Sequence, residues 1–116
     1  MKHEEDNLQS VCVRWFGLQY PAYAMMLAHI PNGGARNPVE GAKFKRMGVR
    51  AGMPDLVLFV PASGAHGLAV ELKARGGRLS AAQKSYAEAF PRFGWRHAVC
   101  RSLEEFVEVV TKYMNG

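Results

Sequence analysis

The residues best suited to chemistry lie in two short stretches, Met53-Pro54-Asp55 and Glu71-Leu72-Lys73. Each stretch carries a carboxylate beside an apolar run, and a lysine follows the second carboxylate by two residues. Mg²⁺ and Mn²⁺ prefer oxygen ligands, usually one or two carboxylates together with waters and the phosphate oxygens of a substrate. Such a metal acidifies a water and neutralises the charge that grows on a scissile phosphate. The two stretches therefore predict metal-dependent phosphodiester hydrolysis.

Apolar runs predict that both carboxylates are carried by neighbouring β-strands. Asp55 opens the run at residues 56–60, and a turn-rich break leads to the second run at residues 68–73. Side chains alternate along a strand, so Glu71 and Lys73 share one face. The other face is apolar and consists of Leu68, Val70 and Leu72. A surface Glu-Lys pair and an Asp at a turn would explain each piece alone, but their combination favours a site.

The predicted site has distinct roles for its members. Asp55 and Glu71 are expected to bind the metal, and the backbone carbonyl of Leu72 is a candidate third ligand. Lys73 would hold the attacking water or stabilise the transition state. Glu5 would complete the metal shell or bind a second metal, although a solvent-exposed acid in the first turn of a helix explains it equally well.

The other elements are expected from periodicity, caps and breakers. Residues 4–19 should form a helix that ends before Pro21, with an inward face of Leu8, Val11, Cys12 and Trp15. A strand is expected at residues 25–30, in which His29 would be packed, and another at residues 95–100. A short helix at residues 38–48 would use three apolar anchors, Ala42, Phe44 and Met47.

Two further helices begin with capping boxes, in which a side chain at the N-cap and one three residues later bond each other's backbone. Ser80 and Gln83 open a helix that should stop at Pro91, so the simplest role of Gln83 is capping. Ser102 and Glu105 open the last helix, with an inward face of Leu103, Phe106, Val107, Val110 and Tyr113. Hairpins and crossovers together predict a mixed sheet with helices on its faces, in one domain over residues 1–116.

The charge of the chain favours a polyanionic partner. Fifteen basic and ten acidic residues give a net charge of +5 and a pI near 9.5. The excess is concentrated in the middle of the chain. A basic run can also be only a solvated face. The candidate contacts to DNA are Asn32, Arg36, Lys43, Lys45, Arg46, Arg50, Arg75 and Arg78.

Other classes of protein are disfavoured by what the chain lacks. Cys12 and Cys100 have no partner at metal-ligand spacing and predict neither a zinc site nor a disulfide framework. No apolar run approaches the length of a membrane span, and the first residues are too polar for a signal peptide. A cytoplasmic location is expected.

The sequence resembles the VRR-NUC family of virus-type replication-repair nucleases. Pro54-Asp55 and Glu71-x-Lys73 match the PD-(D/E)xK nuclease signature, which is weak by itself. The stretches that strengthen the resemblance are Glu5-x-x-Leu8-Gln9, Ile30-Pro31-Asn32-Gly33-Gly34, Gly48-Val49-Arg50-Ala51-Gly52-Met53-Pro54-Asp55, Glu71-Leu72-Lys73 and Leu79-Ser80-x-x-Gln83.

The resemblance implies an α/β fold with a restriction-endonuclease-like core and DNA cleavage that depends on Mg²⁺ or Mn²⁺. It also implies site roles for Glu5, Asp55, Glu71, Lys73 and Gln83. Compact stand-alone members of phage and bacteria are associated with homodimers that cut branched DNA such as Holliday junctions. The alternatives are a non-catalytic nucleic-acid-binding module, or a nuclease that acts on flaps, DNA ends or RNA.

Overall fold

The computed structural model describes residues 2–31 and 37–116, so the candidate DNA contacts Asn32 and Arg36 lie outside the described residues. The elements in chain order are α1 (Lys2–Gln19), the 3-10 helix η1 (Pro21–Met26), β1 (Leu27–His29), α2 (Pro38–Arg46), β2 (Leu56–Leu58), β3 (Leu68–Leu72), α3 (Ala81–Arg92), β4 (Arg96–Cys100) and α4 (Leu103–Asn115). None of the described helices has an apolar stretch long enough to cross a bilayer.

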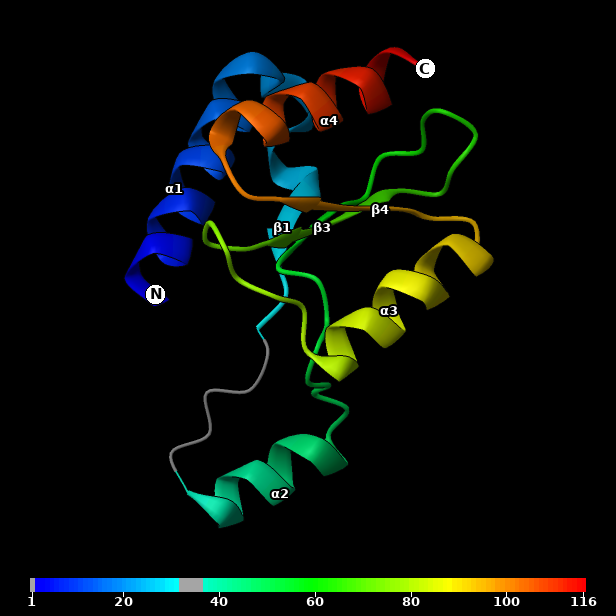
Figure 1. Cartoon of the computed structure of the whole chain (residues 1–116). Helices are drawn as coiled ribbons and strands as arrows, with labels where there is room; N and C mark the ends of the chain where they lie inside the picture. Colours follow the sequence, from blue (N-terminus) through cyan, green and yellow to red (C-terminus); the bar gives the residue numbers. More distant parts are fainter. Residues whose placement is uncertain (1, 32–36) are drawn as a thin grey trace.

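A mixed four-stranded sheet in the order β1-β2-β3-β4 forms the centre of the molecule. Strand β2 is antiparallel to both β1 and β3, whereas β3 and β4 are parallel and joined through α3. Helices α1 and α4 cover one face, and α3 lies on the other (Figure 1). The predicted mixed sheet with flanking helices is therefore confirmed.

The apolar core lies between the sheet and the α1–α4 layer. Leu68, Val70 and Leu72 of β3 belong to it, as the alternation of side chains predicts, and a fully buried phenylalanine from each of the two helices packs into the same core. The intervening residues of β3 point to the α3 side and are buried too. The central strand is thus covered on both faces, which puts Glu71 inside the protein.

Three expectations about individual elements are wrong. Residues 25 and 26 belong to η1 and not to a strand, because the chain after Pro21 makes tight 3-10 turns. Val11 is 46% exposed, and Phe16 takes its place on the inward face of α1. Two of the expected anchors of helix α2, Ala42 and Met47, are exposed, Met47 at 70%, and only Phe44 is half-buried.

The ends of the last two helices also differ from expectation. Pro91 does not stop α3, which runs to Arg92, because a proline in the last turn removes only one helical hydrogen bond. At the start of α4, the Ser102 side chain accepts the N–H of Glu105 as expected. The Glu105 carboxylate, however, accepts the N–H of Arg101 at 2.7 Å, one residue before the N-cap.

Candidate active site

Asp55 and Glu71 face each other across the β2–β3 pair. The ladder pairs Leu56 with Val70, and extending it by one residue sets Asp55 opposite Glu71. Directly opposed residues of antiparallel strands project to the same face. Their side chains are close enough for a hydrogen bond and for the charge of Asp55 to act on Glu71. The two carboxylates predicted to form the site are thus brought together.

Glu71 is the only charged side chain that is fully buried among the described residues, at 2% exposure. Burial raises the pKa of its carboxyl from 4.5 to about 9, and the negative charge of Asp55 and the hydrogen bond to it act in the same direction. The cation of Lys73 lowers the pKa, and the carboxylate of Glu5 raises it. Without a metal, Glu71 therefore retains its proton at neutral pH.

Asp55 is held by backbone contacts on both sides. Its Oδ2 accepts the N–H of Leu72 at 2.7 Å. Its backbone carbonyl accepts the N–H of Ile30 at 3.0 Å and lies 2.8 Å from Nδ1 of His29. His29 is exposed, so its expected packing in a strand is wrong. The contact with Asp55 could not be foreseen, because it spans 26 residues of chain.

The backbone of Leu72 is placed to offer its carbonyl beside Asp55. In a strand, the N–H and C=O of one residue point to the same side, and the N–H of Leu72 points to Asp55. The ladder would set Pro54 opposite Leu72, and proline has no N–H to donate. Pro54 therefore cannot occupy that carbonyl, which makes the predicted third metal ligand chemically reasonable.

Gln83 uses both ends of its amide. Its Oε1 accepts the N–H of Ser80 at 2.8 Å and completes the capping box of α3. Its Nε2 donates to Oε2 of Glu71 at 2.9 Å. The predicted capping contact is therefore present, and the same residue also contacts the proposed site.

Glu5 reaches the same end of β3 from the first turn of α1. Its Oε2 accepts the N–H of Ala74 at 3.2 Å, and its charge acts on Glu71. Its acidic neighbours Glu4 and Asp6 are exposed. Of the three acids near the N-terminus, Glu5 is therefore the one that the helix directs to the site.

The donor set fits a hard divalent cation held by few protein ligands. Asp55 and Glu71 supply two carboxylates, and Leu72 adds a carbonyl, which matches the preference of Mg²⁺ for oxygen ligands and retained waters. Within residues 2–31 and 37–116, no three acidic, His or Cys side chains form a ready-made metal cluster. Glu5 is accordingly placed at the margin of the pair and not as a third member of it.

Comparison with known proteins decides the family. The sequence model of the VRR-NUC domain family matches residues 3–104 of the chain. The chain belongs to the VRR-NUC family. A solved structure described as a VRR_NUC domain protein is 31% identical, with a TM-score of 0.81 over 94% of this chain and 86% of that chain. No curated protein matches the chain. The resemblance and the α/β fold are confirmed, and the family supports a role as a nuclease.

The described cations of this VRR-NUC domain that were predicted to contact DNA are all exposed. Four of them belong to α2 and the segment after it: Lys43, Lys45, Arg46 and Arg50. The other two, Arg75 and Arg78, lie in the turn after β3. No pattern in the sequence indicated that Arg101 supports this turn, which it does through hydrogen bonds of its Nη1 to the carbonyls of Ala74 and Gly77.

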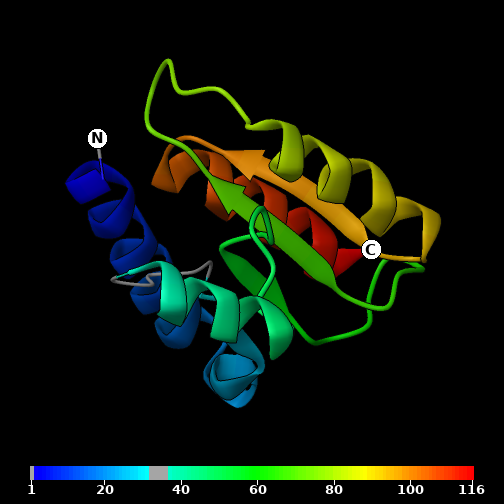
Figure 2. The ribbon, with the colours of Figure 1, turned by 90° about the horizontal axis from the view of Figure 1, so that it is seen from below.

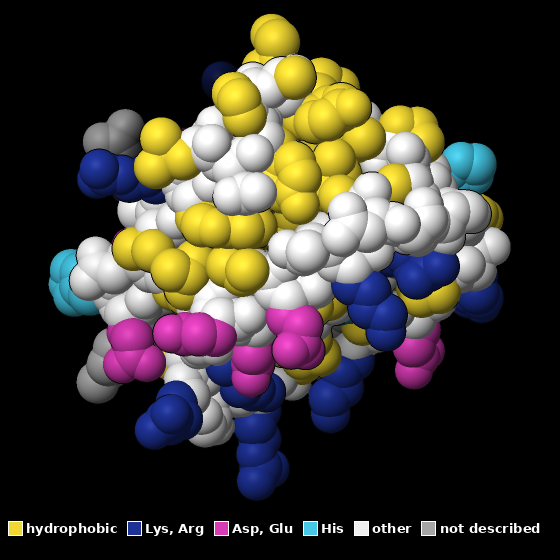
Figure 3. Space-filling view, turned by 90° about the horizontal axis from the view of Figure 1, so that it is seen from above, with side chains coloured by type: hydrophobic (Ala, Val, Ile, Leu, Met, Phe, Trp, Pro, Cys, Tyr) yellow, Lys and Arg dark blue, Asp and Glu magenta, His cyan; other side chains and the backbone are white. Residues whose placement is uncertain are grey.

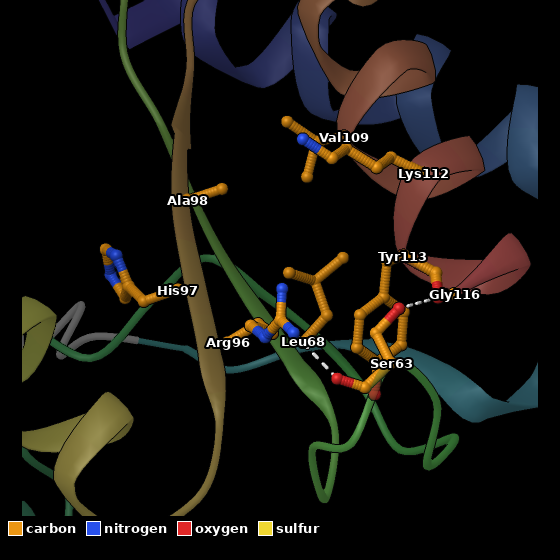
Figure 4. Close-up of a pocket in the computed structure, with 9 residues that line it drawn as sticks. All are labelled: Ser63, Leu68, Arg96, His97, Ala98, Val109, Lys112, Tyr113 and Gly116. Atoms are coloured by element: carbon orange, nitrogen blue, oxygen red, sulfur yellow. Dashed lines mark hydrogen bonds between the residues drawn. The ribbon is translucent and has the colours of Figure 1, made fainter.

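A pocket of about 520 Å³ lies away from the carboxylates. Leu68, Ala98 and Tyr113 line it on the α4 side of the sheet, and Arg96 extends over it (Figure 4). Asp55 and Glu71 do not line it, and Glu71 points to the opposite face. The candidate active site therefore rests on the paired carboxylates and not on the size of a cavity.

Proposed function

We propose that this nuclease hydrolyses DNA phosphodiester bonds with Mg²⁺ or Mn²⁺, acting as an endonuclease on branched DNA. The observation that carries the proposal is the buried Glu71 opposite Asp55, with the cation of Lys73 acting on the same carboxyl. An acid whose pKa is raised by burial and by a second acid is poorly suited to a merely structural role, because it costs stability. A divalent cation would offset that cost.

Each residue has a defined task in the proposed reaction. Asp55 and Glu71, with the carbonyl of Leu72, would hold the metal, which supplies an activated water and neutralises phosphate charge. Gln83 orients Glu71 through Nε2, and the N–H of Leu72 orients Asp55. Lys73 would hold the attacking water or stabilise the phosphate oxygens as their charge grows.

The proposed homodimer is supported by apolar side chains that the monomer leaves exposed. Leu18 of α1 is 75% exposed and Met25 of η1 is 88% exposed. Figure 3 looks down on the face that α1 and α4 form and shows apolar side chains gathered over a broad area. A two-fold dimer has two equivalent sites, which suits the two equivalent strands of a four-way junction. A monomer at working concentration would contradict this part of the proposal.

The test is cleavage of labelled four-way junction, flap, linear duplex and single-stranded DNA, and of RNA, each with Mg²⁺, Mn²⁺ or EDTA. Paired symmetric cuts in the junction, lost in EDTA and in Glu71→Ala, are expected. The matched control Glu88→Ala removes an exposed acid of α3 and should cut normally. If only other substrates are cut, the substrate is a flap, a DNA end or RNA and not a four-way junction. Binding without cutting would favour the non-catalytic module.

A further inference from the structure

We propose that two separate basic segments hold two different duplex arms of a branched DNA, one on each side of the carboxylates. The first segment is the α2 arm, defined as residues 37–50, and the second is the 74–78 loop. This inference rests on the proposed function and deepens it, because it states which part of the protein holds which part of the substrate.

The α2 arm has the properties of a surface that needs a polyanion. None of the residues of helix α2 is fully buried, and most of them, including all of its cations, are exposed. Its last turn carries Lys43, Lys45 and Arg46, and Arg50 folds back to donate Nη1–H to the carbonyl of Lys45 at 3.4 Å. A DNA backbone would neutralise these charges.

A second copy of the chain is a poorer partner for the α2 arm. In a two-fold dimer, the same patch meets itself, so Lys43, Lys45 and Arg46 would face the same three cations. Juxtaposed like charges oppose association. Charge complementarity therefore selects DNA, and the exposed apolar side chains of α1 and η1 remain the better candidates for contact between copies.

The part of the chain that carries the α2 arm returns to the sheet at the site. The chain leaves the sheet at Ile30 and returns at Asp55, and these two residues are hydrogen-bonded to each other. Just before Asp55, the backbone at Gly52 packs closely against the first turn of α3. A Cβ atom added to Gly52 would lie only 2.6 Å from the Cβ atom of Ala82. Ala82 precedes Gln83. DNA bound to the arm is therefore held next to two residues of the proposed site.

The 74–78 loop is built differently and is held firmly. Arg101 donates Nη1–H to the carbonyls of Ala74 at 3.1 Å and Gly77 at 2.6 Å, and the N–H of Gly77 donates to the carbonyl of Ala74 at 2.9 Å. With the turn fixed in this way, Arg75 and Arg78 are left exposed. The loop follows Lys73 directly, so these cations also lie beside the site.

The two basic segments project in different directions. Figure 2 shows α2 and the segment between β3 and α3 on opposite sides of the chain that enters β2. Duplex DNA resists bending over the length of a small protein. Two cationic segments on different sides of one site are thus better suited to two helices that diverge from a branch than to a single straight helix.

The test measures binding of a labelled three-way DNA junction in EDTA, so that no cleavage interferes. The α2-arm variant is Lys43→Gln/Lys45→Gln/Arg46→Gln, and the loop variant is Arg75→Gln/Arg78→Gln. Arg14→Gln/Lys112→Gln, which removes two exposed cations of α1 and α4, serves as the control. Each protein is measured against the intact junction and against junctions in which one duplex arm is shortened. Thermal unfolding checks that each variant is folded.

On the intact junction, the slope of log affinity against log salt should fall by about 3 per bound protomer for the α2-arm variant and by about 2 per bound protomer for the loop variant. Shortening one duplex of the junction should abolish the loss of affinity caused by the α2-arm variant but not the loss caused by the loop variant. Shortening a second duplex should do the reverse. The inference is overturned if both effects disappear with the same DNA arm, or if neither depends on any arm. If the wild type fails to cut DNA in the presence of metal, the proposed function is refuted. The binding experiment in EDTA still tests the present inference by itself.

Discussion

Gln83 and Glu71 are joined by a 2.9 Å hydrogen bond from Nε2 to Oε2, while the other end of the same amide caps helix α3. The side chain is therefore fixed at both ends of its polar group. The start of α3 and the buried acid of β3 are coupled through one residue. Capping and contact with the site can be separated by mutation, because they use different atoms.

Gln83→Glu should separate the two roles. Glutamate is a normal capping-box residue at this position, so the free energy of unfolding should change by less than about 1 kcal/mol. The N–H donor to Glu71 is lost, and cleavage should fall at least about tenfold. Ser80→Ala should do the reverse, costing about 1 kcal/mol through the lost cap and leaving cleavage nearly normal. Equal cleavage by Gln83→Glu and the wild type would remove Gln83 from the site.

Glu71 should make the metal-free protein less stable as pH rises. Its pKa is about 9 in the folded protein against an ordinary 4.5, so between these values the unfolded chain binds fewer protons. The free energy of unfolding therefore decreases with pH over this range. Glu71→Gln removes this titrating group, so near pH 9 the variant should be more stable than the wild type by about 2 kcal/mol or more. The stability difference between variant and wild type is measured by thermal unfolding in EDTA across this pH range.

The control for that experiment is Glu88→Gln, which changes an exposed acid of α3 and should follow the wild type. A wild-type protein whose stability rises with pH over the same range would contradict the protonated state of Glu71. Adding Mg²⁺ to the wild type should raise the unfolding temperature most at high pH, because the metal binds the ionised carboxyl.

Asp55→Asn should abolish cleavage supported by Mg²⁺. Asparagine retains a carbonyl oxygen that can accept the N–H of Leu72, so the fold should survive. It removes the charge, and turnover should fall by about a hundredfold or more. Cleavage of a labelled junction over a Mg²⁺ titration is the measurement. Turnover near that of the wild type at every Mg²⁺ concentration would defeat the metal assignment.

Lys73→Ala should retain DNA binding and lose cleavage. The cation acts on Glu71 at the site and is followed by the basic loop that we assign to binding. Binding in EDTA should be within about threefold of the wild type, whereas cleavage with Mg²⁺ should fall by about a hundredfold. Lys84→Ala, which removes an exposed lysine of α3, should preserve both. Unchanged cleavage by Lys73→Ala would remove its assigned role.

Glu5→Ala should impair cleavage more than Glu4→Ala does. Of these two acids, only Glu5 accepts the N–H of Ala74 and raises the pKa of Glu71, whereas Glu4 is exposed. Initial rates of cleavage with saturating Mg²⁺ measure the difference. If the two variants lose equal activity, the side chain of Glu5 has no special position at the site.

Much of the central sheet could be predicted from the sequence. Alternation along β3 places Glu71 on the face opposite to that of its neighbours Val70 and Leu72, and both of these neighbours enter the core. A hairpin from Asp55 to Glu71 is implied by two apolar runs with a short break between them. These are local patterns, and the local pattern decides which face each side chain takes.

Contacts between distant segments could not be predicted in the same way. Periodicity indicated an inward face on α1 but not that Phe16 would be buried in place of Val11, since that depends on what packs on the helix. Likewise, three apolar residues implied anchors for α2, yet Ala42 and Met47 are exposed. The contacts of His29 and Arg101 join segments far apart in the chain and leave no signature in the spacing of residues.

The hydrogen bond between Ile30 and Asp55 closes the sheet at the point where the α2 arm departs. The sheet therefore does not depend on the length of the arm, and the entropic cost of a longer closed segment grows only slowly with its length. The arm can thus be exchanged or resized in evolution or by engineering while the carboxylates stay in register. The proposed DNA-binding arm and the paired carboxylates are therefore structurally separable parts of the chain.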